Sequence, residues 1–235
     1  MVKKYQIKNL TQKIYIKMRH EIKIPFYKDD SLIIKKFIKT TRGIVRHHKN
    51  RKINSIYFDT KDFQFARYNI EGISKRYKFR TRWYDDNFKE FKYEIKKKID
   101  KLGSKSSYKN KKNDQISLEK LFTPKNEYLL SLLKNDEKFF IKTLNLKPIL
   151  KVSYLREYYI YKNRVRLTLD HTPSYETIGK IKKAKQRDNY SVLEFKFEKE
   201  NFNFGKKLIR NSFINPKRYS KYVKGLSLHN KILYY

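Results

Sequence analysis

Apolar and charged side chains alternate one by one along many short segments of this chain. In the segment from Tyr77 to Trp83, the even positions are Lys78, Arg80 and Arg82, and the odd positions are mostly aromatic. Successive side chains of a strand point to opposite faces, so each such segment has one apolar and one charged face. The pattern predicts strands over Tyr15–Ile24, Asn54–Asp59, Arg76–Tyr84, Phe88–Ile99, Ile149–Tyr161, Arg164–Asp170 and Ser191–Glu198.

A few segments have helical spacing instead. Asp30 and Ser31 form an N-cap signal before a helix that is predicted over Ser31–Lys39. Further helices are predicted over Asp62–Ile70, Glu127–Lys134, Asp136–Leu144 and Lys206–Phe213, with a last one beginning near Ser220. Asp100–Gln115 contains almost no apolar residue and is interpreted as a mobile surface loop. Nothing marks a second domain, so residues 1–235 are expected to form a single α+β domain, an antiparallel β-barrel or strongly curled sheet with helices packed outside.

The charged strand faces contain carboxylates as well as basic residues. Glu21 lies between Arg19 and Lys23, and Glu194 precedes Lys196 by two positions. One interpretation is an ordinary half-exposed sheet with a solvated outer face. In the other, the apolar faces pack against external helices and the charged faces line an interior, which is costly unless a ligand compensates the charges.

The balance of charge indicates the kind of ligand. The chain has 59 Lys and Arg against 23 Asp and Glu, a net charge of +36, so a polyanionic partner is expected: nucleic acid, an anionic membrane surface or polyphosphate. Carboxylates among basic residues favour a metal–phosphate site, because Mg²⁺ and Mn²⁺ bind carboxylate and phosphate oxygens. The chain has no cysteine, no phosphate-binding loop of the P-loop type and no zinc-binding histidine spacing. It also has no apolar run of signal-peptide or membrane-spanning length, so a cytoplasmic protein without a membrane span is expected.

Seven short motifs occur in an order that resembles one known family. They are Arg19-His-Glu21-Ile-Lys23, Ser55-Ile-Tyr57-Phe58-Asp59-Thr60, Lys78-Phe-Arg80-Thr-Arg82-Trp-Tyr84, Glu94-Ile-Lys96, Val165-Arg166-Leu-Thr-Leu-Asp170, Leu193-Glu194-Phe-Lys196 and Ser220-Lys221-Tyr222-Val223. Together they resemble VTC domains, the polyphosphate polymerase domains of the vacuolar transporter chaperone type. These belong to the triphosphate tunnel metalloenzyme (CYTH-like) superfamily, and the resemblance runs from about Arg19 to about Leu226.

The resemblance implies a tunnel barrel that uses Mn²⁺ or Mg²⁺ and transfers the γ-phosphoryl group of ATP to a growing inorganic polyphosphate chain. It implies catalytic roles for Lys78, Arg80, Arg82, Lys96, Arg166 and Lys221. It implies that the same residues and Lys23 bind phosphate. Arg19, Lys151 and Lys196 are also expected to bind substrate. Glu194 would be the leading metal ligand, supported by Glu21 and Glu94.

Two other functions remain open at this stage. One is a tunnel triphosphatase that hydrolyses inorganic triphosphate or nucleotides, and the other is a non-catalytic module that binds polyphosphate or RNA. Hydrolases of the superfamily favour a Glu-x-Glu-x-Lys motif on the first strand. Arg19 stands at the first position of this motif, as in VTC domains, which favours the polymerase. No specific nucleic-acid partner is expected, because the tyrosines mostly fall on the apolar strand faces.

Overall fold

The computed structural model describes residues 19–99, 102–109, 130, 135–179 and 185–233. Nine strands in this part of the chain form one sheet, in which every pair of neighbours is antiparallel. The strands are β1 (Arg19–Tyr27), β2 (Ile44–Asp59), β3 (Arg76–Tyr84), β4 (Asn87–Ile99), β5 (Leu102–Lys109), β6 (Lys147–Tyr161), β7 (Val165–Thr177), β8 (Gln186–Arg187) and β9 (Tyr190–Glu198). Their order is β1-β9-β7-β6-β2-β3-β4-β5, and β8 pairs with β7.

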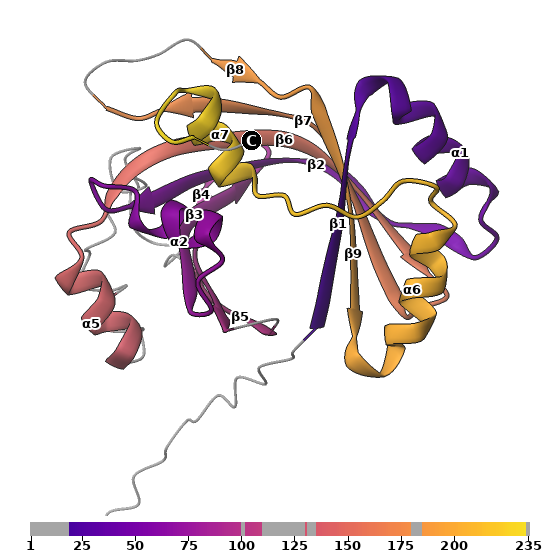
Figure 1. Cartoon of the computed structure of the whole chain (residues 1–235), viewed down its shortest axis with the longest axis horizontal. Helices are drawn as coiled ribbons and strands as arrows, with labels where there is room; N and C mark the ends of the chain where they lie inside the picture. Colours follow the sequence, from indigo (N-terminus) through magenta and orange to yellow (C-terminus); the bar gives the residue numbers. More distant parts are fainter. Residues whose placement is uncertain (1–18, 100–101, 110–129, 131–134, 180–184, 234–235) are drawn as a thin grey trace, which may run out of the picture.

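Five α-helices accompany the sheet in the described residues (Figure 1). They are α1 (Ser31–Thr40), α2 (Gln64–Glu71), α5 (Asn135–Thr143), α6 (Phe202–Arg210) and α7 (Lys221–Leu228), with short 3₁₀ turns at Lys28–Asp30 and Lys199–Asn201. The predicted α+β class and antiparallel sheet are confirmed, whereas closure into a barrel stays a prediction. The helix predicted over Glu127–Lys134 lies outside the described residues except for Leu130.

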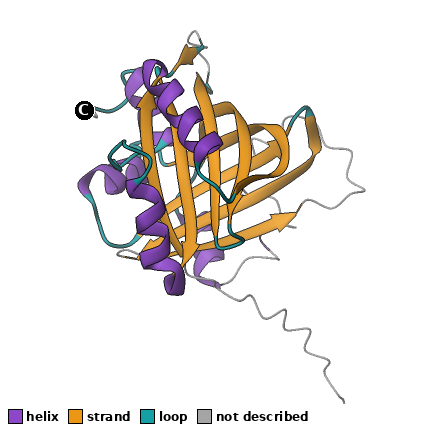
Figure 2. Cartoon of the chain, turned by 90° about the vertical axis from the view of Figure 1, so that its right-hand side faces the viewer, coloured by secondary structure: helices purple, strands orange, loops and turns teal. Residues whose placement is uncertain are grey.

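Two groups of helices cover different parts of the apolar face of the sheet. Ile34 and Phe37 of α1 and Leu208 of α6 pack against outward side chains of β1, β7 and β9, such as Phe195. In the view from that side, these helices cross in front of the strands (Figure 2). Ile141 of α5 packs in a separate cluster over β3 and β4. This burial explains the alternation in the sequence, because one face of each strand must be apolar to meet a helix.

The helix α7 departs from the expectation that all helices pack outside the charged face. Its Tyr222 ring stacks on the Tyr57 ring of β2 at a centroid distance of 4.9 Å, and the Tyr57 hydroxyl accepts a hydrogen bond from Arg80. The helix therefore lies on the same sheet face as the arginines. Gly225 allows this close packing, since a Cβ at that position would lie 2.6 Å from Leu150 Cδ2 and closer still to the ring of Tyr175.

The segment Asp100–Gln115 was expected to be a loop, and this expectation is wrong for residues 102–109. These residues form β5, which pairs with β4 from Leu102 opposite Ile99 to Lys109 opposite Lys92. The strand lacks an apolar face because its outward Ser106 and Tyr108 donate hydrogen bonds to the buried carboxylate of Glu137 on α5. Strand β2 begins at Ile44, ten residues before the predicted start at Asn54. The prediction missed its first half because this half is exposed on both faces and its sequence does not alternate.

Candidate phosphate-binding site

Thirteen charged side chains from seven strands and α7 gather on the inner face of the sheet. We call these nine basic residues and four carboxylates the charged cluster. They are Glu21, Lys23, Lys78, Arg80, Arg82, Glu94, Lys96, Lys105, Arg156, Asp170, Glu194, Lys196 and Lys221.

The sheet curls so far that its opposite ends meet across this cluster. Lys96 Nζ of β4 lies 2.5 Å from Glu21 Oε2 of β1, although β4 and β1 stand near opposite ends of the strand order. In the described residues, β1 and β5 are the two edges, and the side-chain pair of Lys96 and Glu21 spans the seam between these ends. The charged face is therefore the concave side of the sheet.

Glu94 is the centre of the first group of cations. Its carboxylate accepts hydrogen bonds from Arg80 Nε at 2.8 Å and Lys105 Nζ at 2.5 Å, and it lies 3.7 Å from Arg82 Nη1. Burial raises the pKa of Glu94, but the charges of Arg80, Arg82 and Lys105 outweigh burial and hold the pKa well below its ordinary value. The sequence-based prediction gave Glu94 a supporting role as a metal ligand, and this role stays a prediction.

Asp170 is the centre of the second group and is completely buried. It accepts two hydrogen bonds from Arg156, at 2.5 Å from Nε and 2.7 Å from Nη2, and one at 2.5 Å from Lys221 Nζ. Burial raises the pKa of Asp170, but Arg156 and Lys221 bring it down to about 2. The Lys221 ammonium also lies 4.6 Å from the centroid of the Tyr154 ring, which fixes its position further.

The third group contains two carboxylates that interact with each other. Glu194 Oε2 lies 2.8 Å from Lys196 Nζ, and Lys23 Nζ lies 3.6 Å from Glu21 and 4.0 Å from Glu194. Burial and the neighbouring charge of Glu194 raise the pKa of Glu21, but Lys23 and Lys96 bring it below its ordinary value. Burial raises the pKa of Glu194, but Lys196, Lys23 and Arg156 help to hold it well below its ordinary value. The two carboxylates therefore interact with each other and with several cations.

This third group fits a hard divalent cation that shares its coordination with phosphate. Magnesium and manganese sites commonly use one or two carboxylates and complete their coordination with water or phosphate oxygens. Glu21 and Glu194 supply such a pair. No group of three or more His, Cys, Asp or Glu suited to a metal occurs in the described residues.

The beginning of α7 closes one side of the cluster. Ser220 caps the helix by accepting a hydrogen bond from the Val223 amide, and its hydroxyl also accepts one from Lys78 Nζ at 2.8 Å. Lys23 Nζ donates to the carbonyl of Tyr219 just before the helix. Burial and the nearby charges of Lys23 and Lys96 lower the pKa of Lys78 well below its ordinary value. An anion bound beside Lys78 would relieve this repulsion.

The structure brings most of the sequence-predicted site residues together, but not all of them. Arg166 lies on the same face at the edge of the cluster and is exposed. Arg19 is also exposed at the start of β1, opposite Glu198. Lys151 lies elsewhere: it is opposite Ile56 of the outer core in the register of β2 and β6, and its Nζ lies 3.2 Å from Glu176.

Three cluster residues were not among the predicted site residues: Lys105, Arg156 and Asp170, the last of which ends one of the seven motifs. Arg156 escaped notice because its face of β6 is otherwise apolar or aromatic, with Val152 and Tyr154 beneath α7. Lys105 lay in the segment that was predicted to be a loop. The alternation of Lys105, Ser107 and Lys109 was the available signal, but small polar residues make it weak.

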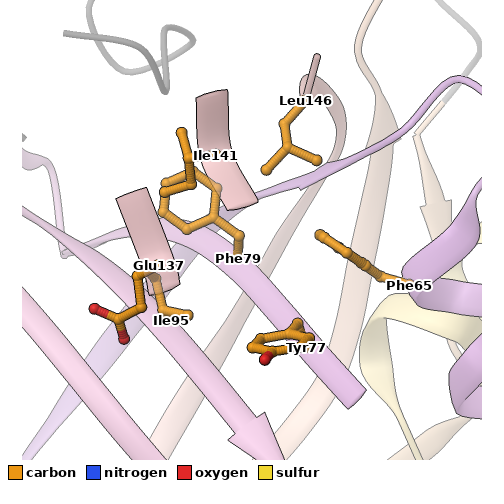
Figure 3. Close-up of a pocket in the computed structure, with 7 residues that line it drawn as sticks. All are labelled: Phe65, Tyr77, Phe79, Ile95, Glu137, Ile141 and Leu146. Atoms are coloured by element: carbon orange, nitrogen blue, oxygen red, sulfur yellow. The ribbon is translucent and has the colours of Figure 1, made fainter. Parts of the chain in front are cut away.

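A separate small pocket lies on the opposite, outer face of the sheet (Figure 3). It is lined by Phe65, Tyr77, Phe79, Ile95, Glu137, Ile141 and Leu146. The Glu137 carboxylate is bound by Ser106 and Tyr108 rather than directed at a free space. This pocket is a gap in the packing beneath α5, and its lining is apolar apart from Glu137 and the Tyr77 hydroxyl.

Comparison with known proteins agrees with this arrangement. The model of the VTC domain family matches residues 2–230. No curated protein sequence matches the chain. Among solved structures, the Hippeastrum protein HpAC1, reported with a dominant triphosphatase activity, is similar with a TM-score of 0.54 and 14% identity, over 92% of this chain and 97% of that one. The PH1819 protein of Pyrococcus horikoshii OT3 gives a TM-score of 0.46 and 16% identity, over 90% and 99% of the two chains. Within the described residues, no helix is long and apolar enough to span a membrane.

Proposed function

The chain belongs to the VTC domain family, and from this premise we propose that it is an ATP-dependent polyphosphate polymerase. It would transfer the γ-phosphoryl group of ATP to the end of an inorganic polyphosphate chain. The observation that supports this most strongly is the charged cluster, in which nine basic side chains and four carboxylates share one concave face.

The excess of cations meets the main electrostatic demand of the reaction. Two like unit charges 4 Å apart repel by about 4 kcal/mol at an effective dielectric constant near 20. Bringing a polyphosphate end against ATP involves several such repulsions. Arg80, Arg82 and Arg156 provide guanidinium charges, and Lys78 and Lys221 add point charges from two sides.

In the proposed step, a terminal phosphate oxygen of the chain attacks the γ-phosphorus of ATP. The new P–O bond forms while the bond to the oxygen that bridges the β- and γ-phosphates breaks, and ADP leaves. The attacking oxygen is already anionic at neutral pH, so the reaction needs no general base. Positioning and charge neutralisation are the tasks of the protein side chains.

The carboxylates have two separate roles in this proposal. Glu94 and Asp170 orient the cations that they bind, whereas Glu21 and Glu194 would hold Mn²⁺ or Mg²⁺. When bound, the metal would neutralise charge on the phosphate oxygens. The exposed Arg19 at the first motif position supports polymerisation over hydrolysis, following the pattern of VTC domains.

Incubation with ATP and Mn²⁺ tests the proposal directly. Gel electrophoresis should show lengthening phosphate chains, whereas release of orthophosphate alone would identify a triphosphatase instead. Arg80→Gln should abolish chain growth, and Lys207→Gln, which removes one exposed charge from α6, should not.

The variant Glu194→Gln tests whether Glu194 binds the metal, with a measurement that does not depend on enzyme activity. With tripolyphosphate present, electron paramagnetic resonance should detect Mn²⁺ bound to the wild-type protein and much less bound to this variant. Undiminished Mn²⁺ binding by Glu194→Gln would remove Glu194 from the metal site, whatever the activity of the variant.

A further inference from the structure

The charged face of the sheet continues beyond the cluster along β2, β6 and β7. Arg51 lies directly opposite Arg156, His48 lies opposite Tyr158, and Arg166 lies opposite Ile160. Residues opposite each other on neighbouring strands point to the same face. We call His48, Arg51 and Arg166 the basic extension. It begins where the charged cluster ends.

The basic extension differs from the cluster in its lack of counter-charges. Among the described residues, no carboxylate forms a hydrogen bond or an ion pair with His48, Arg51 or Arg166. The Arg51 guanidinium instead stacks on Tyr84, 5.4 Å from the ring centroid. Desolvation and the positive charges of His47, Arg51 and Arg166 lower the pKa of His48. Arg51 and Arg166 therefore keep this stretch of the face positive, and no carboxylate among the described residues pairs with them.

The length of the extension exceeds what a short phosphate needs. From Arg156 to Ile160, β6 advances four residues, or about 13 Å at a rise of about 3.3 Å per residue. A triphosphate bound among Arg80, Arg156 and Lys221 would leave this stretch empty. A longer linear polyanion would continue along it without a gap in positive charge.

We propose that His48, Arg51 and Arg166 bind the segment of a polyphosphate chain that emerges from the charged cluster. This inference rests on the proposed function, because it assigns the emerging segment to the polymer bound in the cluster. Its direct consequence is that the protein holds long chains more tightly than short ones.

The aromatic residues of this region favour polyphosphate over single-stranded nucleic acid. Proteins bind single strands by stacking bases on open aromatic faces. Here the Tyr84 ring already has Arg51 at 5.4 Å and the Lys92 ammonium at 5.8 Å, and the Tyr158 ring packs edge to face with the His48 ring. The extension offers cations rather than stacking surfaces.

Binding of two phosphate probes to two matched variants tests the proposal. Arg51→Gln removes one charge from the inner face of β2. Lys52→Gln removes one from the next residue, which lies opposite Leu155 and points to the other face. Long-chain polyphosphate and tripolyphosphate would be titrated against each protein at several salt concentrations, without ATP or metal.

Arg51→Gln should weaken the binding of long-chain polyphosphate by about two- to fivefold, the scale of one exposed ion pair. It should also lower the slope of log affinity against log salt by roughly one unit or less. Tripolyphosphate binding, and all binding by Lys52→Gln, should stay unchanged. In mildly acidic solution, where the imidazole is protonated, addition of His48→Asn should weaken long-chain binding further.

Three results would overturn the proposal. They are equal losses for both phosphate probes, an equal effect of Lys52→Gln, and displacement of long-chain polyphosphate by an RNA oligonucleotide at similar concentrations. These results differ from a failure of the proposed function. If the protein never lengthens polyphosphate but Arg51→Gln selectively weakens long-chain binding, the polymerase fails and the binding site remains.

Discussion

Asp170→Asn replaces the buried carboxylate that pairs with both Arg156 and Lys221. In the wild-type protein, one fully buried side chain compensates two cations at contacts of 2.5 to 2.7 Å. The asparagine has nearly the same shape but no charge. The variant therefore tests whether the cations of the cluster depend on internal carboxylates until a phosphate arrives.

The structure gives the expected size of the effect. Removing one partner of a buried ion pair costs about 3–5 kcal/mol, because a buried charge is left uncompensated. The lower end applies here, since Glu194 Oε2 still lies 3.8 Å from Arg156 Nη2. For a protein of this size, a loss of about 3 kcal/mol lowers the melting temperature by roughly 6–12 °C.

The effect should also depend on pH with a defined sign. The pKa of Asp170 falls from 3.8 to about 2 in the folded protein. A lowered carboxyl pKa stabilises the folded state above the unfolded-state pKa, and this stabilisation is lost as the pH falls towards 2. The difference in stability between wild type and Asp170→Asn should therefore be constant near neutral pH and shrink in acid.

Thermal unfolding with and without tripolyphosphate measures both effects. At one fixed concentration, tripolyphosphate should raise the melting temperature of Asp170→Asn more than that of the wild type. The ligand replaces the missing negative charge and therefore binds the variant more tightly. Asp188→Asn is the control: Asp188 is a buried carboxylate whose side-chain partners are the hydroxyls of Tyr175 and Tyr219, so the ligand should not rescue it selectively. An unchanged melting temperature for Asp170→Asn, or equal gains for all three proteins, would refute the reasoning.

Two other substitutions examine the edge strand and the inner helix. Burial lowers the pKa of Lys105 to about 8, so tripolyphosphate affinity should fall as the pH rises from about 7 to about 9, and Lys105→Arg should reduce this dependence because arginine stays charged. An unaltered pH profile in Lys105→Arg would show that another group titrates. Gly225→Ala should lower the melting temperature, since crowding against Leu150 and Tyr175 at about 1–3 kcal/mol outweighs the gain in helix propensity. A melting temperature at or above that of wild type would contradict this packing.

Much of the sheet could be predicted from alternation, because helices cover its outer face and force one side of each strand to be apolar. Strand β3 illustrates this, with Phe79 in the outer core and Arg80 in the cluster. The prediction failed where this cause was absent. The outward face of β5 includes small polar residues such as Ser106, which binds Glu137, and the first half of β2 is exposed.

The site was predicted less completely than the sheet, and the reason is that neighbours across strands are not visible in a local pattern. Glu94 and Glu194 look alike in the sequence, each two residues before a lysine. In the structure, Arg80 and Lys105 donate hydrogen bonds to Glu94, whereas Glu21 lies close to Glu194. Lys151 shows the converse, a basic strand residue whose side chain belongs to the other face.

The position of α7 has a consequence for the order in which the site is assembled. Every strand of the sheet lies before residue 199, but the cluster also needs Ser220 and Lys221, which arrive only with the final helix. The residues of all nine strands are therefore synthesised before those of the helix that closes the concave face. A chain that ends just before Ser220 would contain the residues of all nine strands and most of the cations. Lys78 would lose its partner Ser220, and Asp170 would lose one of its two partners, Lys221.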